Sequence, residues 1–300
     1  MLQIALLAGC FGGGDDKKED DTGEQGTGPA WVQVASGGYH TCALNEEGTV
    51  ACWGGAEIDV ETDGGENPQE AWGQEAAPGG TFTQITAGLV HTCGLRDDGT
   101  IACWGSDESG QASPPDGEFV QISSKGWLGY AIDADGNVEA WGDRGEGEQP
   151  TPEGLYTQIS AGGSNTCGIQ TTGATYCWGG NDFGQNEVPE GEFVQISAGG
   201  FHVCALDDAG EATCWGQNEF GETEPPDVRF KDIEAGGGHT CGVTEDDEIV
   251  CWGNNQFGET ANTPAENMSV VGVGWDHNCG VGEAGNILCW GSNEAGQSEP

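Results

Sequence analysis

The dipeptide Trp-Gly recurs at seven equivalent positions along the chain, and this repeat constrains the fold more than any other feature. The steps between successive copies are 51, 37, 37, 37, 37 and 38 residues, and the long first step contains an insertion near Gly55–Gln69. The seven tryptophans are Trp53, Trp104, Trp141, Trp178, Trp215, Trp252 and Trp290. Units this short cannot each bury a core, so they must stack on one another.

Within a unit the pattern indicates β-structure. Val194 and Ile196 alternate with polar or aromatic neighbours, as on a pleated strand. Two cysteines then flank a hairpin, and if Cys204 faces Cys214 the loop has three residues with Gly210 at the left-handed position. Asp247 stands at this position in the sixth unit, where it is a tolerated substitute. The sequence therefore predicts an all-β, seven-bladed β-propeller with one blade per repeat of about 37 residues.

The repeats also set the expected domain organisation. Residues 1–10 resemble a signal segment, residues 11–30 an acidic, glycine-rich disordered linker, and residues 31–300 form the propeller. Residues 31–34 could complete the last blade and so close the ring. The repeat units are expected at approximately 31–80, 81–118, 119–154, 155–192, 193–229, 230–267 and 268–300.

The charge of the chain excludes several classes of partner. It has 51 acidic and seven basic residues, with a formal net charge of −44. Nucleic acid needs a basic footprint, and a direct electrostatic hold on anionic lipid needs one too, so neither partner is expected. Many glycines and few large aliphatic residues are typical of disorder, but disordered chains rarely carry 11 Trp and 13 Cys. Disorder is therefore expected only in about the first 30 residues.

Twelve of the cysteines form six pairs, each with nine intervening residues. The hairpin register places the two members of a pair directly across antiparallel strands, which favours disulfides; free cysteines acting as small core residues are the alternative. The spacing is too long for a zinc-ligand pair, and disulfides require an oxidising compartment. In the third unit Tyr130 and Ala140 replace both members together. The expected pairs are Cys42 with Cys52, Cys93 with Cys103, Cys167 with Cys177, Cys204 with Cys214, Cys241 with Cys251, and Cys279 with Cys289.

The remaining cysteine, Cys10, follows Leu7-Ala8-Gly9. This string resembles the lipobox of bacterial lipoproteins, in which the cysteine becomes the lipidated first residue. An ordinary signal remnant is the alternative. The chain has no apolar run of transmembrane length, so membrane attachment is expected only through such a lipid anchor. We expect an extracytoplasmic protein, either lipid-anchored in the bacterial envelope, at the outer membrane or cell surface, or secreted.

The repeat string resembles a known family. The segment from Ile196 to Leu206, followed by Gly210 and the run from Cys214 to Gly221, is similar to the regulator-of-chromosome-condensation repeat. The repeat length is closer to the bacterial branch, which includes the secreted β-lactamase-inhibitor propeller. The resemblance implies a seven-bladed propeller. It says little about activity, and the disulfides and charge oppose the action of the eukaryotic member on a small GTPase at chromatin.

The five histidines each lie two residues before the first cysteine position of a unit. A residue repeated by symmetry solves a problem common to every blade, such as hydrogen-bonding a turn, so a structural role is expected. The acidic turns lack the ligand spacing of a calcium loop, and the sequence contains no phosphate loop or nucleophile elbow. We therefore expect no catalytic residue, no metal site and no cofactor.

Function is expected where the symmetry breaks. The residue before each histidine position varies, belongs to a loop between strands, and is aromatic in several units, as in interface anchors. The alternative in the third unit is that Trp127 and Tyr130 fill the space left by the missing disulfide. The insertion near Gly55–Gln69 is a second candidate. The candidate binding rim comprises Tyr39, Val90, Lys125, Trp127, Leu128, Phe201 and Trp275.

These observations predict a non-enzymatic, extracytoplasmic binding module, expected to be monomeric, that presents the rim to a protein or glycan ligand at the bacterial cell surface. An inhibitor of a secreted or periplasmic enzyme is an alternative. Two further alternatives are a hydrolase or lyase with its site in the central channel, and an acidic coat protein. A unique polar cluster in the channel would favour the enzyme, and a broad aromatic rim would favour binding.

Overall fold

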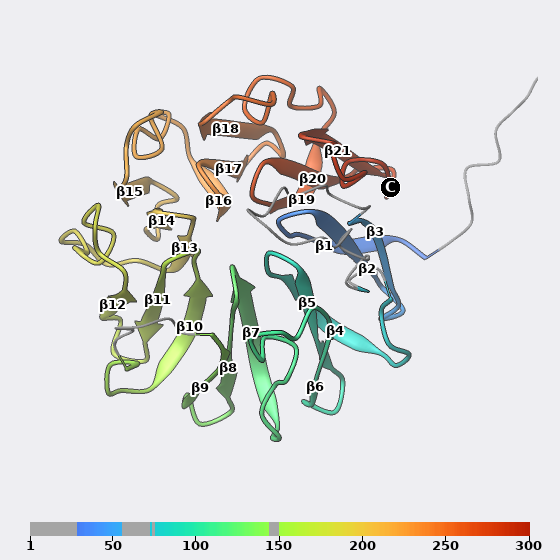
Figure 1. Ribbon diagram of the computed structural model, residues 1–300. Helices are drawn as coiled ribbons and strands as arrows, with labels where there is room; N and C mark the ends of the chain where they lie inside the picture. The colour runs from blue at the N-terminus through green and yellow to red at the C-terminus, as the bar shows by residue number, and fades with distance from the viewer. Residues whose placement is uncertain (1–28, 56–72, 74–75, 144–149) are drawn as a thin grey trace, which may run out of the picture.

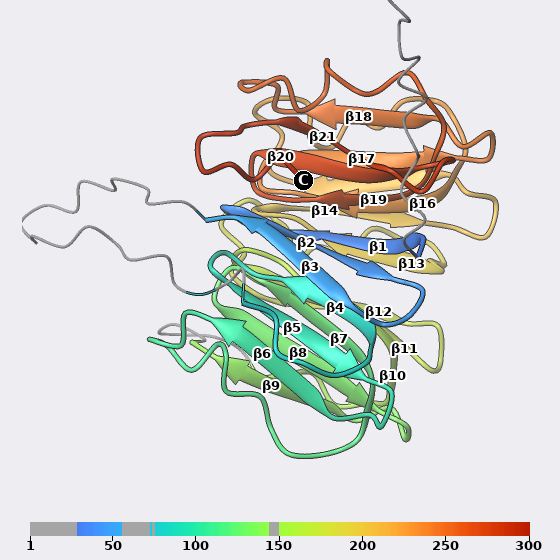
Figure 2. The same cartoon turned by 90° about the vertical axis from the view of Figure 1, so that its right-hand side faces the viewer.

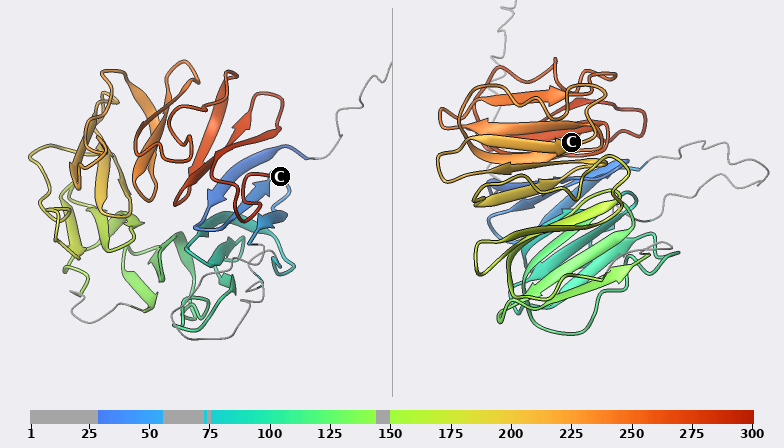
Figure 3. Two further views of the ribbon diagram at one scale, coloured as in Figure 1. Left: turned by 45° about the horizontal axis from the view of Figure 1, so that its top comes forward. Right: turned by 90° about the vertical axis from the view of Figure 1, so that its left-hand side faces the viewer.

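The computed structural model describes residues 29–55, 73, 76–143 and 150–300. These residues form strands and no helix, arranged as seven three-stranded antiparallel sheets around a central axis (Figure 1). Side views show the sheets stacked as blades whose strands run from one face of the ring to the other (Figures 2 and 3). The fold is the seven-bladed propeller that the repeat predicts.

The blades are numbered in chain order. Blade 1 contains β1 (Trp31–Ser36), β2 (His40–Asn45) and β3 (Val50–Gly54); blade 2 β4 (Phe82–Ala87), β5 (His91–Arg96) and β6 (Ile101–Gly105); blade 3 β7 (Phe119–Lys125), β8 (Leu128–Asp133) and β9 (Val138–Gly142); blade 4 β10 (Tyr156–Ala161), β11 (Asn165–Gln170) and β12 (Thr175–Gly179); blade 5 β13 (Gln195–Ala198), β14 (His202–Leu206) and β15 (Ala212–Gly216); blade 6 β16 (Phe230–Ala235), β17 (His239–Thr244) and β18 (Ile249–Gly253); and blade 7 β19 (Met268–Val273), β20 (His277–Gly282) and β21 (Ile287–Gly291). The first strand of each blade lies innermost and lines the central channel.

The hairpin geometry follows the predicted register. Cys204 lies directly opposite Cys214, and the amide of Asp207 donates to the carbonyl of Glu211 around a loop in which Gly210 has a φ of 78°. Asp247 takes the same left-handed conformation in blade 6, with a φ of 64°. One turn geometry therefore recurs even where the glycine is replaced.

Six disulfides join the second and third strands of every blade except blade 3. Their S–S distances lie between 2.02 and 2.10 Å. The bonded pairs are Cys42 with Cys52, Cys93 with Cys103, Cys167 with Cys177, Cys204 with Cys214, Cys241 with Cys251, and Cys279 with Cys289. These are the six pairs that the sequence predicts.

The two members of each disulfide differ in burial, which the sequence did not predict. The first cysteine is fully buried on the middle strand, whereas the second lies half-buried on the outermost strand. The half-buried members are Cys52, Cys103, Cys177, Cys214, Cys251 and Cys289. The reason is position in the blade, because the middle strand has a strand on each side and the outer strand forms an edge. Each bond therefore ties an edge strand to the interior of its blade.

Neighbouring blades share one core, because adjacent residues of a strand point to opposite faces of its sheet. Between blades 4 and 5, Cys167 of β11 packs against Ile196 and Trp215 of blade 5. The indole of Trp215 also donates from Nε1 to the carbonyl of Gln185, at 2.9 Å. A buried tryptophan removes about 150–250 Å² from water. The cysteine face of one blade therefore packs on the tryptophan face of the next, which compensates for the scarcity of large aliphatic residues.

The ring closes differently from the expectation for residues 31–34. The backbone of β1 pairs with β2 in its own blade, so it does not complete blade 7. Instead, Trp31 and Val34 pack across the closure against Val281 of β20. The carbonyl of Gln297, near the C-terminus, accepts hydrogen bonds from Trp53 Nε1 at 3.0 Å and Thr41 Oγ1 at 2.9 Å. The C-terminal segment thus joins blade 7 to blade 1 as each loop joins its own blade to the next (Figure 1).

Several predicted features lie outside the described residues. These are the lipobox with Cys10, nearly all of the linker, most of the insertion near Gly55–Gln69, and Arg144. Within the part of the chain that the structure describes, no helix is long and apolar enough to cross a membrane. The lipid anchor stays a prediction.

Candidate functional site

All five histidines are buried, and four of them, His40, His202, His239 and His277, hydrogen-bond a side chain of a neighbouring blade. His202 Nε2 of blade 5 lies 2.8 Å from Thr240 Oγ1 of blade 6. In the same way, His239 Nε2 of blade 6 lies 2.7 Å from Asn278 Oδ1 of blade 7. Burial lowers the pKa of His202 to about 3 and that of His239 to about 4, so both rings are neutral at physiological pH. These four histidines therefore have the expected structural role, but their hydrogen bonds join two neighbouring blades and do not hold a turn.

Blade 3 interrupts this pattern. Gly129 stands where a hydroxyl would meet His91, and neither ring nitrogen of His91 has a hydrogen-bond partner among the described residues. Tyr130 fills the place of the missing disulfide, because it is fully buried with its ring edge-on to Trp178 at a centroid distance of 6.1 Å. Trp127 does not share this filling role, since its side chain is exposed.

The loops between the first and second strands of the blades encircle one mouth of the channel. Successive loops are hydrogen-bonded to one another; the amide of Gly163, for example, donates to the carbonyl of Gly199 at 2.9 Å. We call this end of the propeller the loop face, and the end that carries the hairpin turns the hairpin face. Trp127 and Phe201 are exposed on the loop face, and Tyr39 is half-buried there. These three predicted rim residues therefore reach the surface of the loop face, and their binding role stays a prediction.

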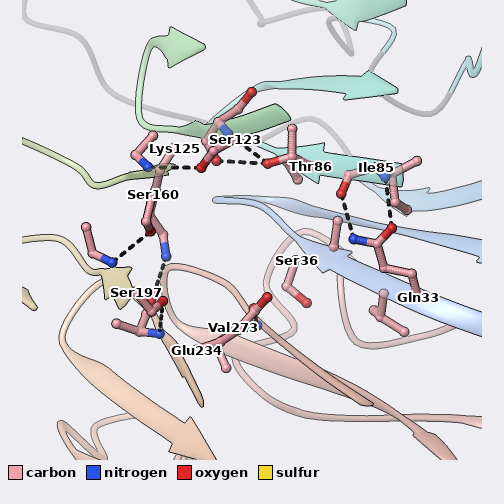
Figure 4. Close-up of a pocket in the computed structure, with 17 residues that line it drawn as sticks. Gln33, Ser36, Ile85, Thr86, Ser123, Lys125, Ser160, Ser197, Glu234 and Val273 are labelled. Atoms are coloured by element: carbon pink, nitrogen blue, oxygen red, sulfur yellow. Dashed lines mark hydrogen bonds between the residues drawn. The ribbon is translucent and has the colours of Figure 1, made fainter. Parts of the chain in front are cut away.

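Three predicted rim residues have other positions, whereas Trp275 lies half-buried in the β19–β20 loop on the loop face. Val90 is only 1% exposed and belongs to the core, and Leu128 packs against the core cluster around Tyr130. These two expectations are wrong as surface positions, because Val90 is buried in the core and Leu128 begins β8 at the position that buried histidines occupy in other blades. Trp275 lies over the glycines of neighbouring loops: a Cβ at Gly237 would come within 3.0 Å of its Cγ. The third displaced residue, Lys125, points into the channel (Figure 4).

Three exposed phenylalanines extend the aromatic surface. Phe183, Phe220 and Phe257 are 49%, 55% and 37% exposed, and each lies in the loop that follows the third strand of its blade. The ring of Phe183 contacts that of Phe201 edge-on, with centroids 5.5 Å apart, which places both on the loop face. None of the three phenylalanines was among the rim residues expected from the sequence. The available signal was the phenylalanine itself, because it is a large apolar residue in a polar loop. The other units have Trp72, Ser109, Glu146 or Ala295 at the same position.

The phenylalanine loops are held in place by buried side chains. In blade 5, the Glu222 carboxylate accepts from the amide of Phe220 at 2.7 Å, and the Glu222 carbonyl accepts from Trp252 Nε1 at 3.0 Å. Gln185 bonds the amide of Phe183 in the same way, at 2.9 Å. The exposed rings therefore sit on loops fixed to the next blade.

The central channel is polar and repeats with the blades. The side chain of Gln158 forms two hydrogen bonds to the backbone of Ile196 in the next blade, through its amide nitrogen and its oxygen. One layer further, Ser160 Oγ accepts from the amide of Ala198. Two blades break the repeat at both positions: blade 6 has Asp232 and Glu234 there, and blade 7 has Val270 and Gly272.

Lys125 and Glu234 line the same cavity in this channel and interact electrostatically (Figure 4). Lys125 comes from blade 3 and its ammonium donates to the carbonyl of Ala235 in blade 6, across the ring. Glu234 accepts from the amide of Val273 at 3.0 Å. Burial lowers the pKa of Lys125 to about 8, while burial and the nearby Asp232 raise the pKa of Glu234 to about 7.

The channel offers little space for a substrate. The cavity around Lys125 and Glu234 measures about 100 Å³, and a second cavity along the glutamine layer about 200 Å³. Typical small-molecule pockets measure roughly 300–1,000 Å³. Within the described residues, no group of three His, Cys, Asp or Glu side chains is arranged to hold a metal ion.

Acidic groups cluster near the outer part of the loop face. Partial burial, together with the neighbouring carboxylates of Glu259 and Glu294, raises the pKa of Asp276 to about 6. The exposed phenylalanine loops also carry acidic residues, such as Asp182 before Phe183. The loop face therefore combines aromatic rings with negative charge.

A known repeat family matches six of the seven units of this chain. The model of the regulator of chromosome condensation (RCC1) repeat matches residues 31–56, 82–111, 156–185, 193–222, 230–259 and 269–297. It does not match the third unit, in which the disulfide and the histidine are both replaced.

Known structures share the propeller. The ectodomain of the receptor kinase CR4 from Physcomitrella patens is similar over 88% of this chain and 73% of its own, with a TM-score of 0.71 and 25% identity. Prp20p of Saccharomyces cerevisiae is similar in fold over 82% of this chain and 80% of its own, with a TM-score of 0.64 and 20% identity. Protein pim1 of Schizosaccharomyces pombe is 31% identical over 84 residues, which are 26% of this chain and 15% of that relative.

Proposed function

Because this chain belongs to the regulator-of-chromosome-condensation repeat family, a family of propellers, we propose that it is a non-enzymatic, extracytoplasmic binding module whose loop face takes a protein ligand at the bacterial cell surface. One observation carries this proposal: a group of exposed aromatic side chains gathers on one face of a rigid ring. Its members are Trp127, Phe183, Phe201, Phe220 and Phe257.

The physical support is the cost of leaving these rings in water. Large aromatic side chains are enriched at the anchoring positions of protein interfaces, where they bury much area and lose little side-chain entropy. Buried side chains such as Gln185 and Glu222 already fix the loops that present them. A ligand would therefore meet a preorganised surface, which reduces the ordering cost of binding.

The proposed location rests on the cysteines and on one comparison. Six disulfides persist only in an oxidising compartment, and the similar propeller of CR4 is itself an ectodomain. Lipidation at Cys10 would tether the propeller to the membrane through the linker. The family branch that includes the β-lactamase-inhibitor propeller belongs to the same proposal, since an inhibitor of a secreted or periplasmic enzyme would use the same face.

The channel enzyme is the weaker alternative. Lys125 and Glu234 are the unique polar cluster that such an enzyme would need. The Lys125 ammonium is, however, held by a backbone carbonyl, and Trp275 lies over the adjacent loops. A cavity of about 100 Å³ holds a few water molecules and leaves no room for a sugar ring or a peptide.

The test compares partner capture by matched variants. Phe183→Ala with Phe220→Ala removes two rings from the loop face, and Tyr176→Ala removes an equally exposed ring from β12, away from that face. Each purified protein is used to capture partners from an envelope extract, and bound proteins are quantified by mass spectrometry. We expect at least one partner retained by the parent and by Tyr176→Ala but lost from the double variant. Identical capture by all three proteins would refute a binding role for the loop face.

A further inference from the structure

We propose that the ligand of the loop face is a cationic polypeptide segment, whose arginine or lysine side chains stack on the exposed phenylalanines and pair with the carboxylates between them. This inference rests on the proposed binding function and adds the chemistry of the partner. The evidence is the distribution of aromatic and charged side chains between the two faces of the propeller.

Aromatic and acidic residues lie side by side in the loops that follow the third strands of blades 4 and 5. An exposed carboxylate directly precedes an exposed ring at Asp182-Phe183 and at Glu219-Phe220. A guanidinium or ammonium over the face of an aromatic ring is attracted by its quadrupole, and a carboxylate beside the ring adds an ion pair. Arginine uses both interactions at once, because its planar group stacks and forms two parallel hydrogen bonds.

Counter-charges are found elsewhere. Arg229 lies 4.0 Å from Glu211, Lys231 pairs with Asp247, and both acidic partners belong to turns of the hairpin face. Arg96 lies 5.7 Å above the ring of Phe82 at the hairpin end of β4. Lys125 is the remaining basic residue in the described part of the chain, and its ammonium is bound inside the channel. No described lysine or arginine side chain therefore neutralises the loop face.

The carboxylates of the loop face repel one another in the absence of a cation. Asp276 shows this effect. Burial makes the largest contribution to its raised pKa, and the carboxylates of Glu259 and Glu294 raise that pKa further. A cationic side chain placed beside Asp276 and the exposed Glu294 would relieve the repulsion, while Glu259 stays buried beneath them. It would approach through the field of a chain with a net charge of −44, which attracts positive charge. The aromatic rings would fix where the ligand's side chain lies, and the carboxylates would make a positively charged side chain the preferred one.

The shape of the surface favours an extended segment over a compact domain. Phe183 lies near blade 5, because it contacts Phe201, while Glu222 fixes the Phe220 loop against Trp252 of blade 6. The equivalent loop of blade 6 carries Phe257 towards blade 7, since Trp290 Nε1 donates to the carbonyl of Glu259 in that loop. The three rings thus follow an arc over successive blade boundaries, which a chain with basic residues at intervals can follow.

The experiment uses a synthetic 12-residue peptide of alternating arginine and glycine as the probe. Binding to the whole chain is measured by calorimetry at 150 mM salt, with an alternating glutamate–glycine peptide and a neutral oligosaccharide as reference ligands. The loop-face variant carries Phe183→Ala, Phe220→Ala and Phe257→Ala. The control variants are Tyr176→Ala on β12 and Asp208→Asn in a hairpin turn. All substituted side chains are exposed, and circular dichroism checks that each variant is folded.

We expect the arginine peptide to bind and the glutamate peptide not to bind. Each lost ring should weaken binding about two- to fivefold, so the triple variant should bind roughly 10- to 100-fold more weakly, while both controls stay within about twofold of the parent. Equal weakening in the controls, or no weakening in the triple variant, would mean that the peptide responds only to net charge, and would overturn the inference. Preferential, ring-dependent binding of the oligosaccharide would overturn it in favour of a glycan ligand.

The two proposals fail in distinguishable ways. If the loop-face rings are needed for partner capture but the arginine peptide does not compete with the captured partner, the binding function stands and the cationic ligand is wrong. If capture does not depend on the rings, the binding function of this face is wrong whatever the peptide does.

Discussion

The buried histidines should make the stability of the propeller acid-sensitive, and His202 allows the effect to be isolated. In the folded chain burial lowers the pKa of His202 to about 3, whereas an unfolded chain restores about 6.5. Between these values the unfolded state binds a proton that the folded state does not. The free energy of unfolding contributed by this residue is therefore fully present above about pH 6.5 and is lost as the pH falls towards about 3.

The magnitude follows from the two pKa values. At pH 5 the unfolded imidazole is about 97% protonated, whereas the folded one remains neutral. The pH then lies about 1.5 units below the pKa of the unfolded imidazole. This is about 2 kcal/mol of lost stability relative to neutral pH for one histidine. The other four histidines shift in the same direction, because burial also lowers their pKa values. Glu234 and Asp276, whose pKa values are raised, act in the opposite direction.

A comparison of variants separates His202 from these other groups. Asn165 already occupies the equivalent position in blade 4, so His202→Asn uses a residue that the fold accepts there. Urea unfolding with the disulfides intact, followed by tryptophan fluorescence, gives the free energy of unfolding at pH 7 and at pH 5. The variant loses the hydrogen bond to Thr240 at both pH values, so the informative quantity is the change between them.

We expect the decrease from pH 7 to pH 5 to be about 2 kcal/mol smaller for His202→Asn than for the parent. The same substitution at His239, whose folded pKa is about 4, should give nearly the same difference, because pH 5 still lies above that value. If the variant and the parent lose the same stability within about 0.5 kcal/mol, the argument from buried neutral histidine is refuted.

Three further results are expected. Replacing Cys204 and Cys214 together by alanine should lower the free energy of unfolding by about 2–3 kcal/mol, measured by urea unfolding, because an 11-residue loop loses its closure; an unchanged midpoint would contradict this. Removing the chain from Gln297 onward should cost about 1–3 kcal/mol for each buried donor left without its acceptor, whereas removing only the last two residues should cost little; equal Tm values for both truncations would refute the proposed closure. Glu234→Gln should lower the pKa of Lys125 below about 8, because the Glu234 carboxylate stabilises the ammonium; an NMR titration that shows no downward shift would contradict the pairing.

Much of the fold could be predicted because the repeat encodes it locally. The interval between cysteines, the left-handed turn residue and the alternation of the strands all act within about 20 residues, and seven copies agree on one register. The rim was predicted less well. Val90 and Trp127 occupy the same repeat position, yet one is buried and the other exposed, since each loop meets a different neighbouring blade.

The sequence by itself determined the number of blades, the hairpin register and the pairing of twelve cysteines, because periodicity and local backbone geometry are properties of short segments. The tertiary structure decided which of the varied residues reach solvent. It brought Lys125 to Ala235, 110 residues away, across the channel, and it made the carbonyl of Gln297 the acceptor that closes the ring. It also gathered three phenylalanines from separate loops on one face. Such contacts depend on how blades distant in sequence are placed around a common axis, and no local pattern carries that information.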